Sequence, residues 1–134
     1  MAAEVFEVQL VSPEQILFEG EAEMVVCRAL DGDIAFLKDH VPYLGVLDDD
    51  AVRIIQPDDT ETAAAVHGGF VQMNGEKLVV LSDLAELKDE IDVARAETAK
   101  ANAEAALAAN ANDEEAAAAL ARAETRLKVA GASS

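Results

Sequence analysis

The chain has 134 residues, which suits one ordinary domain or a domain of about 85 residues with a smaller appendage. A formal net charge of −17 excludes nucleic acid as a partner, because a phosphate backbone needs a patch of Lys and Arg to neutralise it. Much of the 51% hydrophobic content is alanine after residue 93, and alanine buries little apolar area, so the first 85 residues must hold the core.

Short apolar runs separated by turn signals fill residues 1–85. Residues 6–11 alternate apolar and polar side chains, which predicts a half-buried strand that ends near Val11. The dipeptides Asp31-Gly32 and Asn74-Gly75 indicate hairpin turns, because glycine accepts a positive φ without steric cost. Further strands are expected around residues 16–18, 22–28, 34–37, 44–47, 52–54, 63–66, 70–73 and 78–81. This pattern predicts a β-sandwich or flattened barrel of about eight to ten strands.

The same part of the chain is strongly acidic. Residues 1–85 carry 17 acidic side chains and four basic ones, a net charge of −13, which predicts a docking partner with a basic surface. The three carboxylates at residues 48–50 lack the alternating spacing of a calcium loop, so we interpret them as a solvated turn rather than a metal site.

Reactive side chains are few. Cys27 is the lone cysteine and follows three apolar residues, so we expect a buried strand thiol. His40 lies in a proline-bearing loop and is interpreted as an interface residue, whereas His67 at a strand end is interpreted as structural. Neither histidine is close in sequence to a cysteine or to the other, which gives a zinc site little support. With no Gly-x-Ser-x-Gly elbow, no catalytic or metal site is predicted, and residues 1–85 are interpreted as a binding module.

Near residue 86 the β-type runs give way to a tract of strong helix formers. We therefore expect a β-domain at residues 1–85 and a helical part at residues 86–134. Helices are predicted at about 90–108 and 113–129, and Asn112 with Glu115 fits a capping box for the second. Two antiparallel helices joined by a short loop follow from this spacing.

The predicted packing seams of these helices consist mainly of small side chains. The expected seam residues are Ile91, Ala94, Thr98, Ala101 and Ala105 on the first helix and Ala116, Leu120, Ala123 and Leu127 on the second. Methyl groups bury little area, so the hairpin should be marginally stable. A mobile arm and a permanently folded cap both fit this expectation.

Charged side chains are spaced at helical intervals in this part. Asp92 and Arg95 are three residues apart and would project from one helix face. Arg122 and Arg126 form a like-charged pair four residues apart, which needs an anion nearby. That anion would be a carboxylate such as Glu86 or a phosphate group, for which guanidiniums offer paired donors.

Five short motifs occur in a fixed order along the chain. They are Asp31-Gly32-Asp33, His40-Val41-Pro42-Tyr43-Leu44, Val66-His67-Gly68-Gly69-Phe70, Ile91-Asp92-Val93-Ala94-Arg95-Ala96 and Ala121-Arg122-Ala123-Glu124-Thr125-Arg126-Leu127. Together with the division into a β-part and a helical part, they resemble the epsilon subunit of F-type ATP synthases over nearly the whole chain.

The resemblance implies a ten-stranded antiparallel β-sandwich followed by an antiparallel two-helix hairpin. It implies a non-catalytic subunit of the rotating central stalk that sits on the gamma subunit and the ring of c subunits. Such a subunit couples ring rotation to ATP synthesis in the catalytic head of a proton-translocating complex. It lies on the cytoplasmic face of the bacterial membrane as a peripheral component, and no apolar run here approaches the roughly 20 residues of a membrane span.

The resemblance also implies contacts with the stalk. By position, the contacts with the c ring and gamma fall at Ser12, Asp33, His40 and Leu44. The loop at residues 36–40 departs from the family, because Phe-Leu-Lys-Asp replaces the usual Pro-Gly before the histidine.

A regulatory role of the hairpin is implied in the same way. In the family the hairpin either folds against the sandwich or extends along gamma, where it reaches the alpha and beta subunits and inhibits ATP hydrolysis. Bound ATP favours the folded form in some bacterial members, and no cofactor is otherwise required. The ATP-contacting residues fall at Glu86, Asp92, Arg95, Arg122 and Arg126. A further basic residue of that site is replaced here by Asn102, so ATP binding is expected to be weak.

Two other interpretations belong to different classes. A free acidic adaptor or chaperone-like module would capture a partner helix through the small-residue seam. An enzyme that cleaves carbohydrates or esters ranks third, because no paired carboxylates or nucleophile can be assigned.

Overall fold

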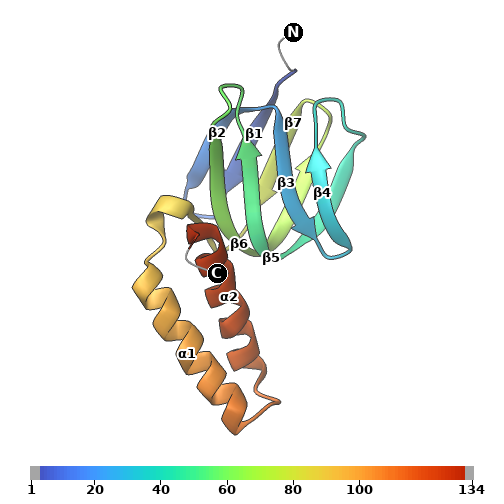
Figure 1. Ribbon diagram of the computed structural model, residues 1–134. Helices are drawn as coiled ribbons and strands as arrows, with labels where there is room; N and C mark the ends of the chain where they lie inside the picture. Colours follow the sequence, from blue (N-terminus) through green and yellow to red (C-terminus); the bar gives the residue numbers. More distant parts are fainter. Residues whose placement is uncertain (1–3, 132–134) are drawn as a thin grey trace.

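The computed structural model describes residues 4–131. Eight strands come first: β1 (Phe6–Val11), β2 (Ile16–Ala22), β3 (Met24–Ala29), β4 (Gly32–Phe36), β5 (Tyr43–Ile55), β6 (Glu61–Met73), β7 (Lys77–Leu81) and β8 (Ala85–Leu87). A short 3-10 helix, η1 (Lys88–Glu90), leads to α1 (Val93–Ala109) and α2 (Glu114–Ala130). Figure 1 shows the strands in two layers and the helices as an antiparallel hairpin, which confirms the predicted fold class.

The strand count differs from the expected ten because β5 and β6 each span 13 residues and serve both layers. Within β6, residues 64–66 pair with β8, whereas residues 70–73 pair with β7. The strand order is β2-β1-β7-β6-β5-β3-β4, and the β1–β7 pair is parallel while the others are antiparallel. The solvated turn expected at residues 48–50 is wrong, since these carboxylates lie inside β5.

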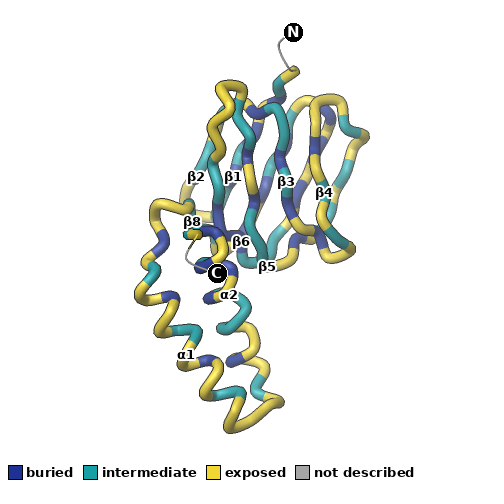
Figure 2. The backbone as a smooth tube through the Cα atoms, viewed as in Figure 1, coloured by how far each residue is buried: buried dark blue, intermediate teal, exposed yellow. Residues whose placement is uncertain are grey.

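The core lies between the two layers, as the dark blue segments of Figure 2 show. Inward-facing Phe6, Val8 and Leu10 are at most 3% exposed, as their alternation predicts. Cys27 is also buried, and burial together with the nearby Asp33 carboxylate raises the pKa of its thiol to about 12. The expectation of an inert strand thiol is therefore confirmed.

Both helices begin at an aspartate. The Asp92 carboxylate accepts a hydrogen bond from the Arg95 amide and caps α1, and the Asp113 carboxylate accepts one from the Ala116 amide and caps α2. The capping box expected at Asn112 is wrong by one residue. Gly131, with φ of 77°, ends α2.

The predicted seam is correct for α2 and wrong for α1. Ala116, Ala123 and Leu127 are buried in α2 as expected, and the fourth expected residue, Leu120, is half-buried. In α1 the buried residues are Ala96 and Ala103, and the expected seam residues after Ile91 are exposed. So many alanines occur in α1 that its sequence contains little periodic signal. Neither helix of the described part is long and apolar enough to cross a membrane.

Gly69 occupies a site that only glycine fits. Its φ is 124°, and an added Cβ would lie 2.2 Å from the carbonyl oxygen of Leu81. We expect Gly69→Ala to lower the free energy of unfolding by about 3 kcal/mol or more, because backbone atoms must move in addition to the strained φ. Urea unfolding of the full chain measures this loss.

Gly32→Ala is the matched control. Gly32 has a similar φ of 130°, but no atom lies within 4 Å of the added Cβ. Its loss should be limited to the conformational cost of about 1 to 3 kcal/mol. Equal losses of unfolding free energy in the two variants would show that the close approach of Gly69 to Leu81 adds nothing to the cost of the positive φ.

Candidate functional site

The hairpin docks on the sandwich through its base. Figure 1 shows that α2 reaches the sandwich with its C-terminal part, while the tip of the hairpin points away, and Figure 2 shows that tip exposed. The apolar contact consists of Ala65, Ile91 and Val129, with Ala51, Ala63 and Ala130 packed against them. These mostly small side chains bury little apolar area, so polar contacts contribute a larger part of the free energy that docks the hairpin.

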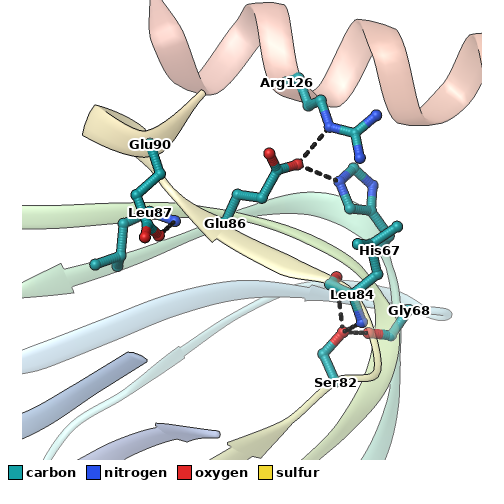
Figure 3. A network of polar contacts seen from close by, with 8 residues as sticks. All are labelled: His67, Gly68, Ser82, Leu84, Glu86, Leu87, Glu90 and Arg126. Atoms are coloured by element: carbon teal, nitrogen blue, oxygen red, sulfur yellow. Dashed lines mark hydrogen bonds and ion pairs between the residues drawn. The ribbon is translucent and has the colours of Figure 1, made fainter. Parts of the chain in front are cut away.

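Two ion pairs join α2 to the sandwich (Figure 3 shows the first). The Arg126 guanidinium donates through Nε to the Glu86 carboxylate of β8, with both side chains about three-quarters buried. Nζ of Lys128 lies 2.6 Å from Oδ1 of Asp50 in β5, but the Lys128 side chain is 62% exposed. The buried pair is less screened by solvent and should contribute more to docking.

His67 lies beneath the first ion pair (Figure 3). Its side chain is 3% exposed, and Nε2 lies 3.8 Å from Oε1 of Glu86, too far for a hydrogen bond. Burial and the Arg126 guanidinium lower the pKa of the imidazole, and Asp49 and Glu86 oppose this shift. The neutral imidazole is therefore favoured in the docked state.

A cleft of about 290 Å³ opens beside this contact, lined by Glu86, Glu90, Asp92, Arg95, Ala96, Ala99 and Arg126. It brings together four of the five residues predicted to contact ATP. The fifth, Arg122, lies one turn before Arg126 on α2 and does not line the cleft. Asn102 lines a separate groove between α1 and α2. Two guanidiniums and three carboxylates can bind a ligand that carries both phosphate oxygens and hydroxyl or amino donors.

Two residues of this region were missed from the sequence. Glu90 lines the cleft, and its carboxylate accepts a hydrogen bond from the Leu87 amide at 3.0 Å, which holds the turn between β8 and α1. Its spacing of four from Glu86 was an available signal. His67 was assigned only a structural role, because its position under Arg126 depends on tertiary contacts.

A second candidate surface lies on the outer face of the sandwich. Directly paired apolar residues run across five strands, and we call them the apolar row: Ile16, Val11, Leu81, Phe70 and Val46. Phe70 is 52% exposed and Leu81 is 46% exposed, on a molecule with a net charge of −17. Exposed apolar patches of this kind are typical of surfaces that bind another protein, a membrane or a ligand. The apolar runs at residues 70–73 and 78–81 were its sequence signal, since both strand faces are apolar there.

The four residues predicted to contact the stalk do not form one surface. Ser12 follows Val11, and Leu44 lies two residues from Val46 on the same strand face, so both flank the apolar row. Asp33 is the second residue of β4, and its carboxylate lies 3.1 Å from the Arg28 guanidinium. His40 lies at the other end of the sandwich from Ser12, beside the Asn74-Gly75 turn, where the Asp39 amide donates to the Gly75 carbonyl.

Two family profiles cover the chain. The one described as "ATP synthase, Delta/Epsilon chain, beta-sandwich domain" matches residues 5–88. The one described as "ATP synthase, Delta/Epsilon chain, long alpha-helix domain" matches residues 89–131.

Bacterial proteins named "ATP synthase epsilon chain" are similar along most of the sequence. The protein from Streptomyces griseus is 46% identical over 110 residues, which cover 79% of this chain and 88% of the relative. The protein from Brevibacillus brevis is 41% identical over 97 residues, covering 72% and 74%.

Solved structures share the fold at low sequence identity. A chain in the structure of the Euglena gracilis mitochondrial ATP synthase, OSCP/F1/c-ring in rotational state 1, aligns with a TM-score of 0.71 and 17% identity. That alignment covers 95% of this chain and 78% of the other. A chain in the central stalk/c-ring structure of the Tetrahymena thermophila mitochondrial ATP synthase aligns with a TM-score of 0.53 and 12% identity, covering 68% and 72%.

Proposed function

The chain belongs to the ATP synthase delta/epsilon family, and we propose from this premise that its β-sandwich docks on the gamma subunit and the c ring. As an epsilon-type chain it is a central-stalk subunit of an F-type ATP synthase. In this role the sandwich passes ring rotation to the catalytic head, as a peripheral component at the cytoplasmic face of the bacterial membrane.

The observation that supports this proposal best is the apolar row. A subunit that transmits rotation needs a firm interface, and an apolar centre with a polar rim provides one. The row crosses five strands of one sheet, so a partner bound there contacts a single rigid element. The acidic remainder of the sandwich steers a basic partner surface toward it.

We assign the chain no catalytic role of its own. The Cys27 thiol has a pKa of about 12 and lies in the core. The Ser82 hydroxyl is buried and donates a hydrogen bond to the carbonyl oxygen of Gly68 at 2.7 Å, which fits a structural role. Catalysis by the complex therefore resides in other subunits.

The hairpin is the detachable arm of this proposal. Its base is held by the ion pairs Arg126–Glu86 and Lys128–Asp50 and by an apolar contact of mostly small side chains, so its release exposes little apolar area. Once released, it would be free to extend along gamma toward the alpha and beta subunits. Glu86 comes from the sandwich and Arg95 and Arg126 from the hairpin, so a ligand in the cleft would favour the docked arm. ATP is the proposed ligand, as a weak regulator rather than a required cofactor.

Phe70→Asp tests the docking surface. We expect it to reduce recovery of the chain with gamma and c subunits from detergent-solubilised membranes by about tenfold or more, because it puts a charge between Leu81 and Val46 in the apolar row. Phe70 is 52% exposed, so the fold should survive, which circular dichroism of the purified variant checks.

Ala35→Asp is its control, because Ala35 is an exposed strand residue of β4 and receives the same charge. It should co-purify normally. Equal recovery of both variants would rule out the row as the docking surface. Recovery of the wild-type chain free of gamma and c would instead favour an acidic adaptor.

ATP binding is tested by calorimetry on the full chain. We expect a dissociation constant in the millimolar range, or about −4 kcal/mol, because the two guanidiniums of the cleft are accompanied by three carboxylates that repel the phosphates. The double variant Arg122→Ala/Arg126→Ala should abolish the binding heat. Arg28→Ala/Arg53→Ala removes the same charge from exposed strand pairs and should leave it unchanged. Identical binding heats in both double variants would show that Arg122 and Arg126 do not bind ATP.

A further inference from the structure

His67 is the feature that the proposed function does not use. Among residues 4–131, its Nδ1 and Nε2 are the buried side-chain nitrogens that lack a hydrogen-bond partner. Burying an unpaired polar group costs free energy, and burying its charged form costs more. The docked hairpin holds this group away from water, because α2 packs against β5 and β6, where His67 lies.

The charged groups around His67 divide by the part of the molecule that carries them. Asp49 of β5 and Glu86 of β8 favour its protonated form, and both belong to the sandwich. Arg126 and Arg122 disfavour that form, and both belong to α2. When the arm leaves, the two cations leave with it, and the two carboxylates stay.

We propose that protonation of His67 releases the helical hairpin from the β-sandwich. Glu86 is the carboxylate that changes partner. In the docked state it accepts from Arg126, and His67 stays neutral beneath that contact, at 3.8 Å. In the released state Glu86 is free to pair with the imidazolium. The inference extends the proposed function, since it assumes that the arm can detach.

The direction of the pH dependence follows from linkage. Docking lowers the pKa of His67, mainly through burial and then through Arg126, so the docked state binds fewer protons than the released state. The docking constant is therefore highest above the ordinary histidine pKa of about 6.5 and falls as the pH drops below it. The arm would thus respond to acidification of its compartment.

Single-molecule energy transfer on the full chain tests this. Dyes are placed at Gln72→Cys in the sandwich and Ala108→Cys near the hairpin tip, both exposed positions, while buried Cys27 stays unlabelled. The docking constant should fall by about threefold or more between pH 8 and pH 5.5. In His67→Gln it should stay constant across that range, and in His40→Gln it should fall as in wild type.

Two further measurements keep the outcomes distinct. Nuclear magnetic resonance of the unsubstituted chain should find the His67 imidazole titrating below the usual histidine range, with His40→Gln used to assign the signals. Arg126→Ala should raise the released fraction at every pH. If Arg126→Ala releases the arm but acid does not, the His67 proposal fails alone. If neither does, the detachable arm fails as well.

The proposal is also overturned if His67→Gln retains the full pH dependence, because carboxylates would then be responsible. It is equally overturned if acid strengthens docking, because the imidazolium would then pair with Glu86 inside the docked state. Urea unfolding of His67→Gln at pH 8 checks that the variant is folded, so that its pH dependence can be interpreted.

Discussion

The contact between Arg126 of α2 and Glu86 of β8 is the interaction on which the position of the hairpin depends. The apolar contact beside it is made mainly of alanines with Ile91 and Val129, which bury little area. Removing one partner would leave a partly buried charge without compensation, which costs more than an exposed pair does. The Glu86 carboxylate thus pairs with Arg126, lines the proposed ligand cleft and lies near the imidazole of His67. A change at any of these three can therefore influence the docking of the hairpin.

The apolar row and the hairpin base both lie on the long strands β5 and β6. Within β6, His67 lies under the hairpin base, and Phe70 lies in the apolar row three residues later. Gly68 and Gly69 lie between them, both with positive φ, where β6 passes from its pairing with β8 to its pairing with β7. At Gly69 the backbone of β6 passes so close to the Leu81 carbonyl that no side chain fits between them.

Local sequence patterns predicted the order of the elements well. Strand alternation located Phe6, Val8 and Leu10 in the core, and the helix bounds were close to those observed. The ATP-contacting positions came from the family resemblance, and four of them line one cleft. What failed depends on tertiary structure: the continuity of β5 and β6, and the buried face of α1, where alanines give no periodicity. The apolar runs at residues 70–73 and 78–81 indicated two strands of the apolar row, but the alignment of residues from five strands depends on strand pairing.

A double-mutant cycle between Glu86 and Arg126 tests the central claim most directly. The fraction of docked hairpin is measured in wild type, Glu86→Gln, Arg126→Gln and the double variant at pH 8. We expect each single change to weaken docking, and the double change to be less than additive, with a coupling free energy of about 1 to 2 kcal/mol. Fully additive effects would contradict the account, because the two side chains would then act on docking independently.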